Sequence, residues 1–159
     1  MSIIDINVQW IQVLSHLSHL TIAYLLALPI GLDRQTSSRH FGLRTYPLVS
    51  VAACGFMLVG IAVIDTTDGE ARIFQGIITG IGFIGGGAIF KGENSVAGMA
   101  SAASLWSTAG IGLATAYNRF EIAIVLCLLN VMTLHLVGRL ETKVKELNAP
   151  DPSSPDESS

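Results

Sequence analysis

The chain has 159 residues, of which 50% are apolar and only 13% are charged, and its mean hydropathy is +0.56. Soluble domains carry about 25% charged residues, so this composition excludes an ordinary soluble domain and indicates a polytopic membrane protein. The formal net charge is -3, and no basic run indicates nucleic-acid binding.

Two apolar segments in the first half of the chain are long enough to cross a bilayer, and we predict helices over residues 9–32 and 47–64. Trp10 marks the entry to the first segment in the manner of an interfacial anchor. Because residues 1–7 include no Lys or Arg, a cleaved signal peptide is not expected.

The third segment, predicted as a helix over residues 73–90, is rich in glycine. Gly76 and Gly80 are four residues apart, as are Gly82 and Gly86, and this spacing is typical of close helix packing in membranes. We therefore expect this helix to be the one on which the others pack. The residues expected to serve packing are Gly76, Gly80, Gly82, Gly85, Gly86 and Gly98.

The same stretch matches the G-x-G-x-x-G pattern of dinucleotide-binding folds through Gly80, Gly82 and Gly85. That pattern requires a preceding strand and an acidic residue about 20 positions further on. Leu105 and Trp106 stand at that distance, so the pattern does not indicate a nucleotide site and no cofactor is expected.

The second half of the chain contains two more apolar segments, and we predict helices over 98–117 and 121–138. The first is full of Ala, Ser, Thr and Gly, whereas the second is rich in Leu, Ile and Val. We expect a membrane domain over residues 1–138, followed over residues 139–159 by a short cytoplasmic helix extension and a disordered tail.

The positive charges divide unequally when the loops are assigned alternately to the two sides of the membrane. Arg72 and Arg119 fall on one side, and the other side receives Arg34, Arg39, Arg44, Lys91, Arg139, Lys143 and Lys145. The positive-inside rule then predicts an all-α protein with five transmembrane helices, the N-terminus outside and the C-terminus in the cytoplasm.

Charged residues gather where the first predicted helix ends and the second begins. Asp33 and Arg34 close the first helix, and Arg44 opens the second. A charge at this depth pairs with another charge or extends toward the headgroups, so Asp33 can pair with Arg44 across the loop. The charges either fix the orientation of the helices or form a site for an ion or partner.

Two histidine groups invite a metal-binding interpretation. His16 and His19 lie on one helical face and can share a metal or a proton, but a two-histidine site needs further ligands. For these residues, and for His135 in the last segment, interfacial or interhelical hydrogen bonding is favoured. Asp68 and Glu70 form an acidic turn in which a divalent-cation site is the less favoured alternative to solvation.

No catalytic set is visible in the sequence. The fourth segment carries four hydroxyl side chains that are expected to bond to the preceding turn or to another helix, namely Ser101, Ser104, Ser107 and Thr108. None of them stands in a nucleophile–base pattern, so enzymatic activity is not expected. Cys54 and Cys127 fall inside predicted crossings and are expected to be free thiols.

Four motifs in order resemble the membrane domain of the bacterial MgtC/SapB family over about residues 20–138. They are Gly31-Leu-Asp-Arg34, Gly42-Leu-Arg-Thr45, Arg72 ahead of Gly80-Ile-Gly-Phe-Ile-Gly-Gly-Gly87, and Gly98 through Ala102-Ala-Ser-Leu-Trp106. By matching position, the resemblance implies functional roles for Asp33, Arg34, Arg44, Arg72, Asn94 and Trp106.

The chain departs from the family pattern in several places. The family usually has Glu at the position of Asp33, more threonines in the stretch before Trp106, and often Arg at the position of Ala97. MgtC proper is expected to carry a folded cytoplasmic domain after the fifth crossing, whereas this chain has 21 residues after Gly138. The shorter SapB-like members are therefore the closer comparison.

The resemblance implies a multi-pass protein of the bacterial inner membrane, linked in some relatives to growth at low magnesium, survival in macrophages and restraint of the F-type ATP synthase. Our first hypothesis is a non-enzymatic regulator that binds another membrane protein, or a second copy of itself, through the glycine-rich helix. The alternative is a small oligomeric channel or transporter for Mg²⁺ or another cation.

Overall fold

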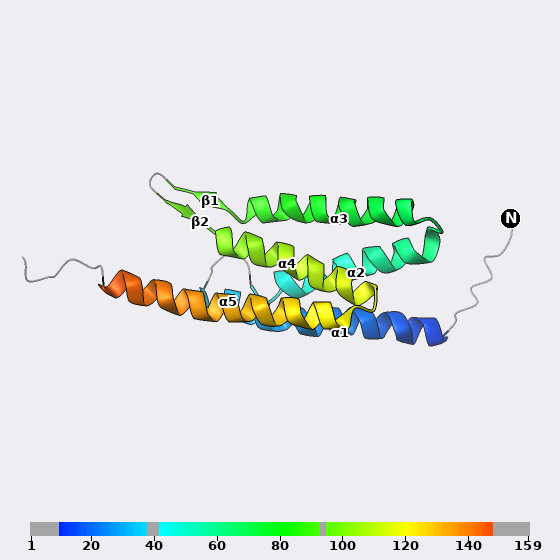
Figure 1. Ribbon diagram of the computed structural model, residues 1–159, viewed down its shortest axis with the longest axis horizontal. Helices are drawn as coiled ribbons and strands as arrows, with labels where there is room; N and C mark the ends of the chain where they lie inside the picture. The colour runs from blue at the N-terminus through cyan, green and yellow to red at the C-terminus, as the bar shows by residue number, and fades with distance from the viewer. Residues whose placement is uncertain (1–9, 38–41, 93–94, 148–159) are drawn as a thin grey trace, which may run out of the picture.

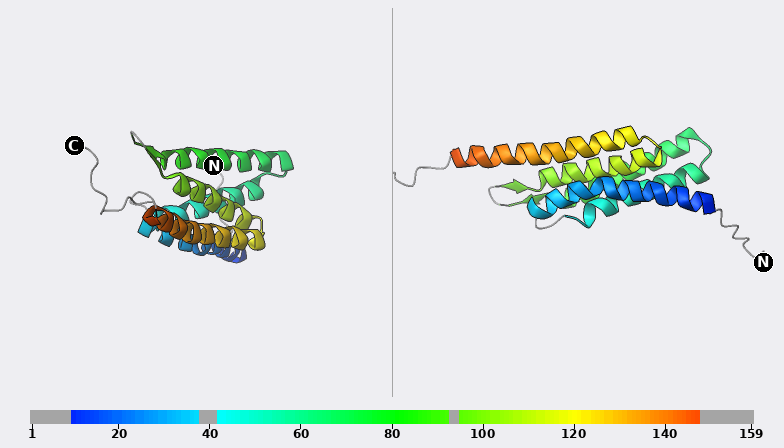
Figure 2. Two further views of the ribbon diagram at one scale, coloured as in Figure 1. Left: turned by 60° about the vertical axis from the view of Figure 1, so that its left-hand side comes forward. Right: turned by 90° about the horizontal axis from the view of Figure 1, so that it is seen from below.

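The computed structural model describes residues 10–37, 42–92 and 95–147, and within these ranges the chain forms five helices and one short hairpin. The elements are α1 (Trp10–Ser37), α2 (Thr45–Val63), α3 (Thr67–Gly87), β1 (Phe90–Lys91), β2 (Val96–Ala97), α4 (Met99–Ala116) and α5 (Phe120–Leu147). The helices run lengthwise in one bundle (Figures 1 and 2). The prediction of an all-helical architecture is confirmed, with the hairpin as an addition.

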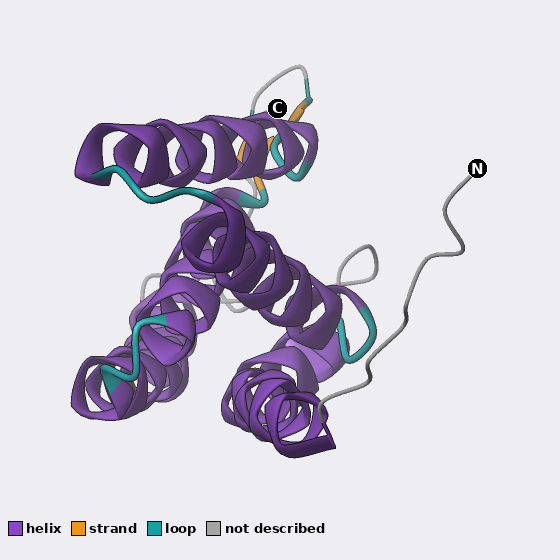
Figure 3. Cartoon of the chain, turned by 90° about the vertical axis from the view of Figure 1, so that its right-hand side faces the viewer, coloured by secondary structure: helices purple, strands orange, loops and turns teal. Residues whose placement is uncertain are grey.

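Helix α4 is the centre of the bundle, because it contacts each of the other four helices (Figure 3). Its buried residues form a broad face, and small side chains on that face, such as Ser101, Ala109 and Gly112, let the neighbouring helices approach closely. Helix α3 lies at the edge and packs on α4 and α2. The prediction that the other helices pack on the glycine-rich segment is therefore wrong.

The closest approach of two backbones joins α2 to α4 at Gly112. A β-carbon at Gly112 would clash with the carbonyl oxygen of Ser50 and would lie 3.0 Å from the backbone nitrogen of Cys54. Only a residue without a side chain fits at this position, and the sequence analysis did not single it out.

Helix α3 begins six residues earlier than predicted, at Thr67 instead of residue 73. The Thr66 hydroxyl accepts a hydrogen bond of 3.3 Å from the Gly69 backbone N–H, which caps the first turn. Asp68 and Glu70 lie in that first turn, where negative charge stabilises the amino end of a helix. The predicted acidic turn is thus the first turn of α3.

The connection between α3 and α4 is an antiparallel hairpin that pairs Phe90 with Ala97 and Lys91 with Val96. Gly98 follows it with a φ of 89°, and a β-carbon there would clash with the Ala88 carbonyl oxygen. This left-handed conformation favours glycine and lets α4 start directly after β2.

Three of the five helices are long and apolar enough to cross a membrane, over Trp10–Gln35, Thr45–Val63 and Phe120–Gly138. Helices α3 and α4 are not among them. Glycines and hydroxyl residues lower their apolar content, and α3 also carries Asp68, Glu70 and Arg72 near its start. These three helices indicate a membrane protein.

The connections gather at two opposite ends of the bundle (Figures 1 and 2). The hairpin and the carboxyl ends of α1 and α5 lie at one end. The start of α1, the α2–α3 turn and the α4–α5 turn lie at the other. Helix α5 continues without a break to Leu147, so the predicted extension over residues 139–147 belongs to the same helix as the last apolar segment.

Candidate functional site

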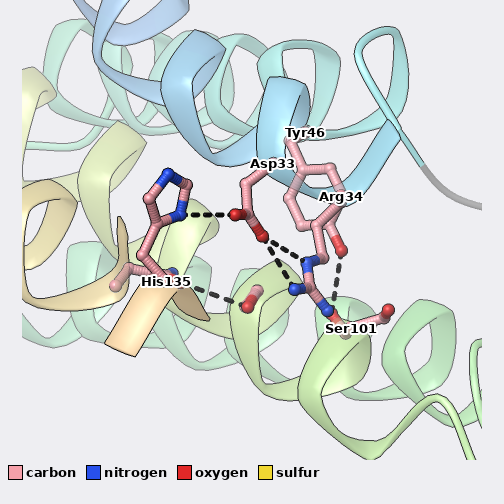
Figure 4. Close-up of polar contacts among 7 residues, drawn as sticks. Asp33, Arg34, Tyr46, Ser101 and His135 are labelled. Atoms are coloured by element: carbon pink, nitrogen blue, oxygen red, sulfur yellow. Dashed lines mark hydrogen bonds and ion pairs between the residues drawn. The ribbon is translucent and has the colours of Figure 1, made fainter. Parts of the chain in front are cut away.

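Three residues form a polar contact near the carboxyl ends of α1 and α5, and we call Asp33, Arg34 and His135 the Asp33 cluster (Figure 4). The His135 side chain is 55% exposed, whereas the other two are buried. Helix α1 ends at Ser37, five residues beyond the predicted end, so Asp33 and Arg34 lie in its last turns. Their side chains are only 8% and 12% exposed, respectively. The cluster therefore places charge among packed helices.

Arg34 curls back onto its neighbour in the chain. Its Nη2 and Nε atoms donate to Asp33 Oδ2 over 2.7 Å and 3.1 Å. Both hydrogen bonds converge on the same carboxylate oxygen, and such charge-assisted bonds are stronger than those between neutral groups. Removing one partner of such a buried pair lowers the stability of the protein by about 3–5 kcal/mol, because the remaining charge stays buried without a partner.

His135 joins the pair from α5, where its Nδ1 lies 2.6 Å from Asp33 Oδ1. An ionised carboxylate can only accept hydrogen bonds, so the Nδ1 atom carries the proton and donates it. This bond links α1 to α5 directly, and the prediction of an interhelical hydrogen bond for His135 is confirmed.

Tyr46 and Ser101 connect two further helices, α2 and α4, beside the cluster. The Tyr46 hydroxyl donates to the Ser101 carbonyl oxygen over 3.3 Å and joins α2 to α4, and the Tyr46 side chain is fully buried (Figure 4). Polar contacts therefore tie α1 to α5 and α2 to α4 at the same end of the bundle.

Hydroxyl groups continue the polar contacts along α4. Ser104 donates to Asn130 Oδ1 on α5 over 3.1 Å, and Thr108 donates to the Ser104 carbonyl one turn earlier over 2.7 Å. These bonds confirm the two expected modes for the hydroxyls of this helix. The Ser50 hydroxyl and the Asn130 amide nitrogen are buried without a hydrogen-bond partner in the described structure.

Arg44 does not pair with Asp33, so that expectation is wrong. Asp33 is held by Arg34 and His135, whereas the Arg44 side chain is exposed and forms no ion pair with any residue that the structure describes. Arg44 instead lines a groove between α2 and α3. The sequence analysis predicted only Arg44 as a partner of Asp33, and the structure places Arg34 there instead.

The polar groups at the opposite end are separate from the Asp33 cluster. Arg72 pairs with Asp68 over 3.3 Å, and both side chains are more than 80% exposed. Glu70 accepts a hydrogen bond of 2.9 Å from the Tyr117 hydroxyl. The structure therefore does not bring Arg72 together with Asp33 and Arg34.

His19 on α1 bonds to Asn118 in the turn between α4 and α5, with its Nε2 atom 2.8 Å from the Asn118 side-chain oxygen. His16 is exposed. Within the described residues, no group of three or more His, Cys, Asp or Glu side chains is placed to hold a metal ion. Cys54 and Cys127 are buried free thiols, as predicted.

Two other residues implied by the resemblance lie elsewhere. Trp106 is 56% exposed and lines a pocket of about 390 Å³ among α3, α4 and α5. Asn94 lies outside the described residues. The position of Trp106 places a large aromatic side chain on the outside of the central helix.

The glycines expected to serve packing differ in their surroundings. A β-carbon on Gly85 would lie 3.6 Å from the Ala102 carbonyl oxygen, an ordinary packing contact between α3 and α4. A β-carbon at Gly76, Gly80, Gly82 or Gly86 would meet no described atom within 4 Å outside the backbone of α3 itself. These four glycines therefore do not make close packing contacts with the other helices of the described structure.

Comparison with known proteins gives a consistent family assignment. The sequence profile of the MgtC family matches residues 20–143. Protein MgtC of Salmonella typhimurium is 33% identical over 132 residues, which are 83% of this chain and 56% of that protein. An uncharacterised protein of Synechocystis is 36% identical over 108 residues, which are 68% of this chain and 46% of that protein.

YhiD of Escherichia coli, named as a candidate magnesium transporter, is 30% identical over 126 residues, which are 75% of this chain and 59% of YhiD. The chain thus spans about half the length of the curated relatives that it matches. No solved structure matches the chain.

Proposed function

Because this chain belongs to the MgtC family, we propose that it is a non-enzymatic protein of the bacterial inner membrane that acts in magnesium and membrane-energy homeostasis. The observation that carries the proposal is the family match over residues 20–143, which includes the whole Asp33 cluster. Buried charges in a membrane helix bundle are costly and are typical of functional or orienting positions.

We propose further that all five helices cross the membrane, with the N-terminus outside and the C-terminus in the cytoplasm. The arrangement of the ends supports this topology, because the hairpin with Lys91 and the carboxyl ends of α1 and α5 lie together (Figure 1). Arg72 and Arg119 belong to the opposite end. The excess of positive charge at one end favours that end as the cytoplasmic one.

The mode of action that we propose is contact between helices of different proteins. Gly82 and Gly86 lie four residues apart on α3, and a β-carbon on either would meet no described atom within 4 Å outside α3, so another membrane helix can approach them closely. A membrane-protein partner such as the F-type ATP synthase, or a second copy of this chain, is the kind of molecule that fits such a face.

Growth at low magnesium tests the proposed function. A strain that lacks the gene is expected to grow poorly at micromolar Mg²⁺ and to recover with the wild-type chain but not with Gly86→Leu at equal protein level. The same variant is expected to lose crosslinks to its membrane partner. Unchanged crosslinks and full recovery with Gly86→Leu would contradict the proposed contact.

A small oligomeric channel or carrier for Mg²⁺ or another cation is the second candidate. The observation that favours it is the Asp33 cluster, a buried carboxylate at a helix end in a chain similar to YhiD. Purified protein in liposomes distinguishes the two candidates. Flux of Mg²⁺, Na⁺, K⁺ or H⁺ that is lost with Asp33→Asn would favour transport, and vesicles without flux favour the regulator.

A further inference from the structure

A groove of about 1140 Å³ lies between α2 and α3. It extends along α2 from Arg44 to Val59, and along α3 it passes Gly76 and Gly80, where missing side chains leave space. Fifteen residues of helix correspond to about 22 Å of length. Helices α2 and α3 meet at their turn and diverge away from it (Figure 1).

The walls of the groove are apolar, with Phe56 and Phe83 among the side chains that line it. Phe83 is 87% exposed. Water forms few hydrogen bonds with such apolar walls. A hydrocarbon chain therefore fits this groove better than water does.

The mouth of the groove is different, because Arg44 and Thr45 line it at the start of α2. Arg44 forms no ion pair with any residue that the structure describes, since Asp33 is engaged by Arg34 and His135. A guanidinium and a neighbouring hydroxyl provide the hydrogen-bond donors that a phosphate group accepts.

We propose that this groove binds an anionic phospholipid of the inner leaflet, with an acyl chain along α2 and α3 and the phosphate on Arg44 and Thr45. The inference rests on the proposed function, because it requires both helices in the bilayer with Arg44 at the cytoplasmic face. Half of the hydrocarbon core is about 15 Å thick, so a groove of about 22 Å reaches from the headgroups past the bilayer centre. Basic residues at the cytoplasmic surface attract anionic headgroups.

A helix from another protein fits the groove less well than a lipid chain. A helix would leave the Arg44 charge unmatched unless it carried an acidic residue at the same level. An anionic phospholipid carries an apolar chain and a negative headgroup together, which match the apolar walls and the Arg44 charge at the mouth. The charge at the mouth of the groove therefore favours the lipid.

Native mass spectrometry of the purified protein in neutral detergent tests the inference. The probes are dioleoylphosphatidylglycerol, which is anionic, and dioleoylphosphatidylcholine, which has the same acyl chains and no net charge. Wild-type protein is expected to bind the anionic lipid more tightly. Arg44→Gln is expected to weaken that preference about five-fold, whereas Lys91→Gln, an exposed cation at the same end, keeps it.

A second pair of variants tests the groove itself. Gly80→Leu places a side chain in the groove and is expected to abolish binding of both lipids, whereas Gly87→Leu adds the same side chain on α3 outside the groove and preserves binding. Equal binding by Gly80→Leu and wild type would overturn the inference. A wild-type dimer that forms without lipid and dissociates with Gly80→Leu would also overturn the inference, because it would place a second copy of the chain in the groove.

Failure of the lipid site can be distinguished from failure of the proposed function. A protein that restores growth at low magnesium but shows no lipid preference at Arg44 would contradict the lipid site alone. A chain recovered from cells in the aqueous fraction would contradict the proposed function, and the lipid site with it.

Discussion

His135 on α5 lies 2.6 Å from Asp33 on α1, measured between Nδ1 and Oδ1, and these two atoms join residues 102 positions apart in the chain. The Arg34 guanidinium holds the other carboxylate oxygen at 2.7 Å. The Asp33 carboxylate is thus shared between its own helix and the last one. Its removal has consequences for both, and the following variants measure them.

Asp33→Asn is expected to destabilise the protein by about 3 kcal/mol, because the buried Arg34 charge loses its partner. Thermal unfolding in detergent measures the effect. Asp68→Asn is the matched control, since it breaks an Asp–Arg pair that is exposed and is expected to cost at most about 0.5 kcal/mol. Equal effects of the two substitutions would show that the Asp33 pair is not buried.

A double-mutant cycle measures the link between the two helices. His135→Gln alone is expected to cost about 1 kcal/mol, the usual net value of one hydrogen bond in a partly exposed position. Combined with Asp33→Asn, its effect is expected to shrink, with a coupling energy of about 0.5–3 kcal/mol. Strict additivity would contradict the bond between α1 and α5.

Gly112→Ala is expected to destabilise the protein by about 1–3 kcal/mol, because the new methyl group collides with the backbone of α2 at Ser50. Gly76→Ala places the same methyl group in open space on α3. It is expected to be neutral or stabilising by up to about 1 kcal/mol, since alanine favours the helix. Chemical denaturation of both variants checks the difference, and a reversed order would be incompatible with α4 as the central helix.

The helices themselves could be predicted from the sequence, because long apolar segments separated by charged loops leave few alternatives in a membrane. The predicted ends of the helices were less accurate. The start of α3 carries a cap at Thr66 and two acidic residues in the first turn, and this helix signal was interpreted as a loop. The hairpin has strands of two residues, which are too short to leave a pattern in the sequence.

The packing partners could not be predicted, because they depend on which face of each helix meets a neighbour. Gly112 and Gly76 are both glycines in apolar segments, yet a β-carbon at Gly112 would clash with the backbone of α2 and one at Gly76 would lie in open space. The same holds for Asp33, which had Arg34 and Arg44 within reach along the sequence. His135 could be suspected only as a polar residue in an apolar segment that needs a partner.

The proposed topology depends on the number of membrane crossings. Labelling of an introduced cysteine in the β1–β2 hairpin measures that number most directly. In a chain with Cys54→Ala and Cys127→Ala, Ser95→Cys lies at the cytoplasmic face if five helices cross, and outside if only α1, α2 and α5 do. Thr67→Cys, at the opposite end of α3, is outside in both cases. A membrane-impermeant maleimide is expected to label Thr67→Cys in intact cells and Ser95→Cys only after permeabilisation. Labelling of Ser95→Cys in intact cells would contradict the five-crossing bundle.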